Sequence, residues 1–148
     1  MPFQKKTVKH PKNSMSLTLG LVQAAMDENL EAITQAQLAL SKSSAIDIFA
    51  DLGDFYSRIS SGITAESKEI MRIEIAAVEG PEELRTAVRE IATPLIVDND
   101  GHAAVAAINR HGAELITRTD NLWFGVIMET VFAAARINVL LGIRLNWN

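Results

Sequence analysis

The residues of this chain that most resemble a chemical site are Asp98-Asn99-Asp100-Gly101-His102, whose carboxylates and amide are oxygen ligands of the kind that calcium prefers. A calcium loop also needs further oxygens at fixed offsets and a late glutamate that binds the ion with both oxygens. No glutamate follows until Glu114. Because Asp, Asn and Gly are favoured in tight turns, the segment is predicted to be a turn and not a calcium site.

Other patterns of metal ligands are also incomplete. The chain has three histidines, His10, His102 and His111, which are too few and too far apart to form a metal site by themselves. A di-iron bundle needs Glu-x-x-His on two helices, and the sequence contains none. The grouped glutamates are predicted to lie on solvated helix faces, so neither a metal nor a cofactor is expected.

Motifs for nucleophilic or nucleotide chemistry are missing from the sequence. It has no Gly-x-Ser-x-Gly, no phosphate loop and no dinucleotide fingerprint. Its serines cluster at 41–44 and 57–61, which are predicted helix ends and turns. Catalytic residues often lie on loops, and the predicted loops are short. The sequence therefore favours a protein that is not an enzyme.

The element around which the other helices must be arranged lies in the segment from Asp120 to Asn146, where the predicted helix is apolar around most of its circumference. Such a helix lies at the centre of a protein or in a membrane. Its interior charges, Glu129 and Arg136, argue against a membrane span, because each would be costly in hydrocarbon. With Asp120 as N-cap and Gly142 as the stop, it is predicted to be the central helix of a bundle or the face that meets a partner.

Side chains of this C-terminal segment are predicted to form an interaction surface. Trp123 and Phe124 are candidate anchors for a partner, with core packing an equal alternative for Trp123. Trp147 follows the helix stop and is expected to contact another surface or chain. Glu129 and Arg136 lie on one side of the helix, which either faces water, pairs with other helices, or fixes the register of an oligomer. The predicted interaction residues are Trp123, Phe124, Met128, Glu129, Phe132, Arg136 and Trp147.

Apolar residues at helical spacing predict further helices over residues 15–41, 45–60, 64–79 and from 81 onward. Thr64 is predicted to cap the third of these. Gly53 suggests a close helix crossing in the second.

The path of the chain after residue 92 is less uniform. Thr93-Pro94 is predicted to kink or restart the fourth helix, since proline has no amide to donate. Apolar spacing of three and four then continues from Val105 to Val126, so the fifth helix is predicted to run, long or kinked, into the last one. Asp120 would then lie inside a helix and not cap one. With no strand pattern in the sequence, the predicted fold is an all-α bundle of five or six helices with a long apolar C-terminal helix.

Charge is distributed unevenly along the 148 residues. Residues 1–14 contain four lysines and no acid, and are predicted to be a flexible basic arm, either a solvated tail or an electrostatic tether to an acidic surface. Residues 15–148 are predicted to be a single helical domain, and they hold all 18 acidic residues. An acidic body without a basic stripe argues against nucleic acid as the main ligand.

Cysteine usage and the N-terminal composition suggest a compartment. The chain has no cysteine, which excludes disulfides and thiolate metal sites and fits a reducing environment. No apolar stretch closely follows the N-terminal lysines, so no signal peptide is predicted and the cytoplasm is the expected location.

Two short segments resemble phasins. Residues 29–37 (NLEAITQAQ) resemble the Asn-x-Glu-Ala-x-x-x-Ala pattern that opens the phasin helical domain, and residues 80–84 (GPEEL) resemble the turn before its second long helix. Phasins are small, cysteine-poor helical proteins that coat polyhydroxyalkanoate granules through amphipathic surfaces and often oligomerise. The sequence departs from this pattern in its breaks near residues 43 and 62 and in its apolar C-terminal segment.

The leading functional hypothesis is a non-catalytic interaction or coat protein that uses amphipathic helix faces to associate with itself and to bind a hydrophobic surface. One alternative is a structural subunit of a larger assembly, such as a virion, filament or secretion apparatus. Another is a small binding module, such as a chaperone or toxin-neutralising protein. The expected partners are further copies of the chain and either a hydrophobic granule or a protein client.

Overall fold

The computed structural model describes residues 9–40 and 45–145, and all of the regular structure in these ranges is helical. The all-α prediction is confirmed, although the described ranges contain seven α-helices and not five or six. The α-helices are α2 (Lys9–Met26), α3 (Leu30–Leu40), α4 (Ala45–Ile59), α5 (Ala65–Ala76), α6 (Glu82–Ala92), α7 (Gly101–Leu115) and α8 (Leu122–Leu141). A 3₁₀ turn, η1 (Ser60–Gly62), follows α4, and a π-helical segment, η2 (Thr93–Asp98), follows α6.

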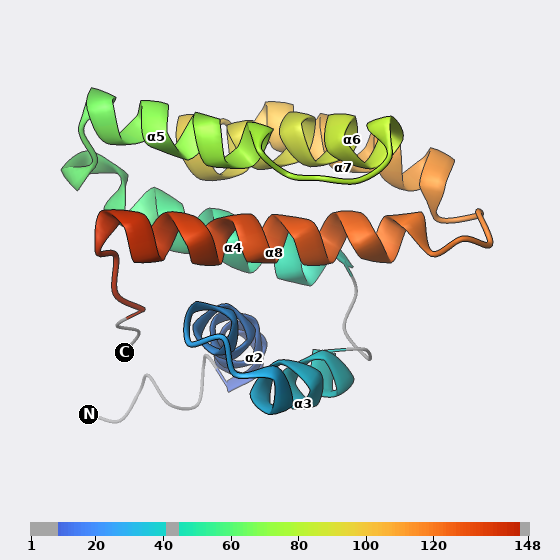
Figure 1. Ribbon diagram of the computed structural model, residues 1–148, viewed down its shortest axis with the longest axis horizontal. Helices are drawn as coiled ribbons and strands as arrows, with labels where there is room; N and C mark the ends of the chain where they lie inside the picture. The colour runs from blue at the N-terminus through green and yellow to red at the C-terminus, as the bar shows by residue number, and fades with distance from the viewer. Residues whose placement is uncertain (1–8, 41–44, 146–148) are drawn as a thin grey trace.

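The helices form three layers (Figure 1). Helices α5, α6 and α7 make one outer layer, α4 and α8 lie in the middle, and α2 and α3 form a hairpin on the other side. Helix α8 packs against α2 on one side and against α5 and α6 on the other. It is therefore the central helix of the bundle, which is one of the two roles that the sequence predicts for it.

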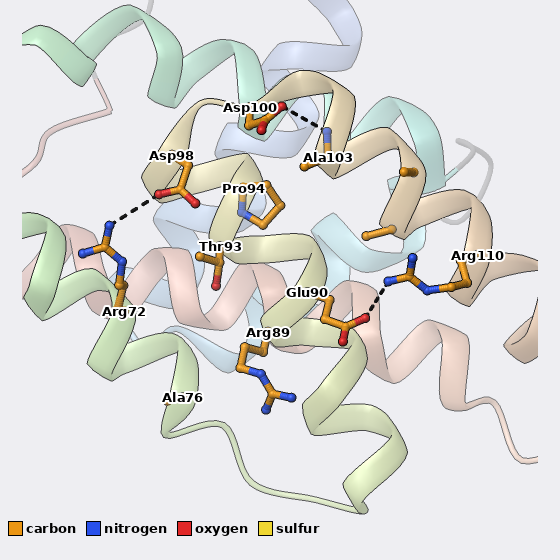
Figure 2. A pocket seen from close by; sticks show the side chains of 12 residues that line it. Arg72, Ala76, Arg89, Glu90, Thr93, Pro94, Asp98, Asp100, Ala103 and Arg110 are labelled. Atoms are coloured by element: carbon orange, nitrogen blue, oxygen red, sulfur yellow. Dashed lines mark hydrogen bonds and ion pairs between the residues drawn. The ribbon is translucent and has the colours of Figure 1, made fainter.

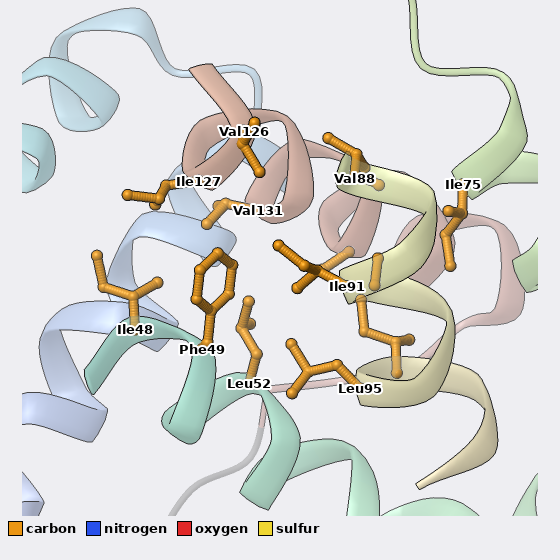
Figure 3. Close-up of a cluster of buried hydrophobic side chains, with 14 of the residues drawn as sticks. Ile48, Phe49, Leu52, Ile75, Val88, Ile91, Leu95, Val126, Ile127 and Val131 are labelled. Atoms are coloured by element: carbon orange, nitrogen blue, oxygen red, sulfur yellow. The ribbon is translucent and has the colours of Figure 1, made fainter. Parts of the chain in front are cut away.

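The core fills the space between α4, α6 and α8, whose apolar side chains point toward one another (Figure 3). Phe49 and Leu52 of α4 meet Ile91 of α6 and Val131 of α8, and each of these side chains is buried. Helix α8 is also the one described helix long and apolar enough to cross a membrane, but 56% of that stretch is buried inside the protein. A core helix has this same composition.

The helix predicted over residues 15–41 is wrong as a single element, because the chain reverses between α2 and α3. Glu28 has a φ of 53°, and the Asn29 side chain caps α3 by accepting a hydrogen bond from the Ala32 amide (3.1 Å). Leu19 and Val22 of the predicted apolar stripe are buried, but Leu30 is 78% exposed. The reversal leaves Leu30 at the surface, although Ile33 and Ala36 of α3 still pack against the core.

The predicted continuity between the fifth helix and the last is also wrong. Helix α7 ends at Leu115 and α8 begins at Leu122, and Asn121 between them has a φ of 58°. The Asp120 carboxylate accepts a hydrogen bond from the Leu122 amide (3.3 Å), so Asp120 serves the first turn of α8 from outside it. The reversal lets α7 lie in an outer layer and α8 at the centre.

Several local predictions are confirmed. The Thr64 side chain caps α5 by accepting from the Ser67 amide at 3.0 Å. A Cβ on Gly53 would lie 3.0 Å from Leu95 Cδ1, so α4 and η2 do cross closely there. The turn before α7 is also confirmed, since Asp100 caps that helix by accepting from the Ala103 amide. These predictions rest on local hydrogen bonds and backbone geometry.

The first helix begins before its predicted boundary, whereas the last helix ends where it is predicted to end. Helix α2 begins at Lys9, so it includes the last part of the predicted basic arm, and residues 1–8 lie outside the described ranges. Helix α8 ends at Leu141. Gly142 follows with a φ of 67° and is the predicted stop.

Candidate functional site

A groove of about 800 Å³, called here the hairpin groove, lies between the α2–α3 hairpin and the C-terminal half of α8. Its lining residues are Ala25, Met26, Glu28, Leu30, Ile33, Glu74, Phe132, Ala135, Arg136, Val139 and Leu140. Met26, Ile33 and Phe132 are partly buried and pack against the core. The groove is thus an extension of the core to the surface.

Large apolar side chains stand exposed at the edges of the hairpin groove. Leu30 is 78% exposed, and Val139 and Leu140 are each 58% exposed. They come from α3 on one side and α8 on the other, which are brought together only by the reversal at Glu28. Clustered exposed apolar side chains mark surfaces that bind partners, whereas scattered ones need no explanation.

An ion pair lies at one edge of the hairpin groove. The Arg136 Nε atom is 3.3 Å from the Glu74 Oε1 atom, so α8 is tied to α5. The sequence leaves three roles open for Arg136, and the structure shows pairing with another helix. Its aliphatic stem lines the groove while its charge is neutralised by Glu74.

Glu129 lies about two turns before Arg136 on α8, in a small polar pocket with Glu79 and Arg136. Burial raises the pKa of the Glu129 carboxyl, Arg136 opposes this shift and Glu79 adds to it. Glu129 and Arg136 therefore share a side of α8, as predicted, but that side faces the end of α5.

The other predicted interaction residues are divided between core and surface. Trp123 and Met128 are buried, so for Trp123 the core-packing alternative holds. Trp123 packs edge-on against Phe49, with ring centroids 5.9 Å apart, and lies close over Gly112. Phe124 is 51% exposed at the N-terminal end of α8, away from the groove. Trp147 lies outside the described residues.

A second depression, of about 710 Å³, is a charged cleft between α5, η2 and α7. Thr93 and Pro94 lie between two ion pairs, Arg72 with Asp98 at 3.4 Å and Arg110 with Glu90 at 2.6 Å (Figure 2). Because these charges pair with one another across the cleft, they connect its walls. Nothing in the sequence signals this cleft, because its ion pairs join residues 26 and 20 positions apart.

Glu90 pairs with two side chains of α7 in this region. It lies 2.6 Å from the Arg110 Nη2 atom and 2.7 Å from the His111 Nε2 atom. These hydrogen bonds lower the pKa of the Glu90 carboxyl, and the one with His111 has the largest effect. The three residues tie α6 to α7. Within the described ranges no group of three or more His, Cys, Asp or Glu side chains is placed to hold a metal ion.

Comparison with known proteins adds no relative. No protein-family model matches the sequence, and neither a curated protein nor a solved structure matches it.

Proposed function

We propose that this protein is a non-catalytic interaction protein that binds the apolar face of a partner in the hairpin groove. The observation that carries the proposal is the exposure of Leu30, Val139 and Leu140 along the edges of a groove that is itself lined by core-packed apolar side chains. Covering these side chains would be favourable by about 25 cal/mol for each Å² of apolar surface removed from water.

A protein client fits this groove better than the surface of a hydrophobic granule. The groove is concave, and an amphipathic helix can insert side chains from one face into such a groove. A coat of the kind that phasins form needs a flat or convex apolar face. The more apolar side of α8, which includes Val126, Val131 and Ile137, is buried inside the bundle.

The proposal is tested with a fluorescent amphipathic peptide that carries leucines at i, i+3, i+4 and i+7 and glutamines elsewhere, called the glutamine peptide. Fluorescence anisotropy with the full chain is expected to show saturable binding. The double variant Leu30→Ser, Leu140→Ser is expected to bind it roughly tenfold more weakly or worse, because two apolar contacts at the groove edges are lost.

A matched control uses apolar side chains that are equally exposed but lie outside the groove. Val105 and Ile116 are 55% and 65% exposed, and the double variant Val105→Ser, Ile116→Ser is expected to bind like the parent chain. Circular dichroism establishes that both variants remain helical. The proposal is wrong if the peptide does not bind, or if both double variants weaken its binding equally.

A further inference from the structure

The reversal between α2 and α3 carries exposed acidic side chains, and no basic residue lies near it in the sequence. Residues 13–41 contain no Lys or Arg, whereas Asp27, Glu28 and Glu31 lie exposed at the reversal. None of these three carboxylates forms an ion pair with a cation in the part of the chain that the structure describes. Glu28 lines the hairpin groove directly. The hairpin edge of the groove is therefore negative.

The opposite edge of the groove has no such excess. Glu74 is the acidic residue on the α5 side, and Arg136 neutralises it at 3.3 Å. Negative potential is thus concentrated along one edge, next to an apolar floor made by Met26, Ile33 and Phe132. A complementary ligand has an apolar stripe and positive charge beside it.

We infer that the occupant of the hairpin groove is a cationic amphipathic helix of another protein, an inference that rests on the proposed function. Its apolar stripe would face the groove floor, and its Lys or Arg side chains would face Asp27, Glu28 and Glu31. A helix presents anchors at i, i+3, i+4 and i+7 on one face with flanking positions free for charge, which is the pattern that this groove and edge require.

A second copy of this chain is a poorer occupant on electrostatic grounds. In a two-fold symmetric contact through this groove, the same patch meets itself, so both copies bring Asp27, Glu28 and Glu31 into one interface, and the groove lining supplies no base besides the paired Arg136. Like charges placed opposite each other oppose association. Self-association through the groove is therefore an outcome that would overturn the inference.

The inference is tested by comparing the glutamine peptide with a lysine peptide, which has the same leucine stripe but lysines in the flanking positions. The full chain is expected to bind the lysine peptide roughly fivefold more tightly at about 50 mM NaCl. This preference is expected to fall at about 300 mM NaCl, because salt screens exposed charges. Anisotropy measures both affinities, and light scattering measures the mass of the free chain.

Paired variants locate the source of the preference. Glu28→Gln with Glu31→Gln is expected to abolish the preference for the lysine peptide over the glutamine peptide. The double variant Glu82→Gln, Glu114→Gln changes the net charge by the same amount, but these two residues line a separate cleft between α6 and α7. This variant is expected to retain the preference for the lysine peptide.

Three outcomes would overturn the inference in distinguishable ways. Equal binding of the two peptides removes the cationic specificity and leaves the proposed function standing. Binding of neither peptide removes both. The chain could instead form a dimer that Leu140→Glu dissociates and whose formation prevents peptide binding. That result would identify a second copy of the chain as the occupant of the groove.

Discussion

A buried tyrosine connects the three helices that surround the core on the hairpin side. The Tyr56 hydroxyl of α4 donates to Asn138 Oδ1 of α8 at 2.6 Å, and the Asn138 amide lies 3.7 Å from the Met26 sulfur of α2. Burial raises the pKa of the Tyr56 hydroxyl, so it stays protonated and remains a donor at neutral pH. A satisfied polar group in the core favours one helix register, because any shift would leave it unpaired.

Replacing Tyr56 with phenylalanine is expected to lower the free energy of unfolding by about 1–3 kcal/mol, because the buried Asn138 oxygen would lose its donor. Urea denaturation of the variant measures this difference. Adding Asn138→Leu to Tyr56→Phe is expected to recover part of the loss, since both polar groups are then removed. A Tyr56→Phe variant as stable as the parent chain would show that the hydrogen bond contributes nothing net.

Glu129 is expected to make stability depend on pH in the opposite sense to a paired carboxylate. Its folded pKa is raised above the ordinary 4.5, so in the window between these values the folded state binds more protons than the unfolded state. The contribution of Glu129 to the free energy of unfolding is therefore fully present below the ordinary pKa. It is lost as the pH rises through the raised pKa of the folded state.

Replacing Glu129 with glutamine removes this loss. The quantity to compare is the free energy of unfolding of Glu129→Gln minus that of the parent chain. This difference is expected to be more positive at pH 7 than at pH 4, and urea denaturation at each pH measures it. The control is Glu66→Gln, which also removes one negative charge but at an exposed position of α5. The same change with pH in both variants would show that burial of Glu129 is not the cause.

At the scale of the helices, the sequence predicts a helix boundary best where nearby side chains cap the helix. Helix α4 was predicted nearly to the residue, and its buried face of Ile48, Leu52 and Phe55 follows the helical period. Thr64 and Asp100 cap α5 and α7 through hydrogen bonds to nearby amides. Such bonds join residues three apart in the chain and need no tertiary contact.

The two missed reversals have no glycine or proline to signal them. Glu28 and Asn121 adopt positive φ, a conformation that is uncommon for a residue other than glycine. In both places the apolar spacing continues across the reversal, through Leu30 and Leu122. Periodicity shows that a segment has an apolar face, but not that the segment stays straight.

At the scale of the whole molecule, α3 is the most peripheral helix. It packs mainly on α2, whereas α8 is surrounded by α2, α5 and α6 (Figure 1). Much of α3 is exposed, including Leu30 and Leu38. Helices with few buried contacts open at lower free energy than the core of the same protein.

Hydrogen exchange is expected to show this difference directly. Amides of α3 should be protected at least about a hundredfold less than those in the middle of α8, because α3 can detach without opening the core. Binding of the lysine peptide should raise protection in α3, which forms one wall of the hairpin groove. Equal protection of α3 and α8 in the free chain would mean that the hairpin opens only with global unfolding.

The all-α class, the Thr64 cap and the Gly53 crossing followed from the sequence, because they depend on composition, on a hydrogen bond between residues three apart and on the missing side chain of Gly53. The sequence left two roles open for the apolar C-terminal helix and two environments for Trp123, and it did not predict the hairpin groove. The helical period determines which side chains share a face. Only the packing of α2, α3 and α8 decides whether that face meets another helix or water, and so leaves Leu30 and Leu140 uncovered at the edges of one groove.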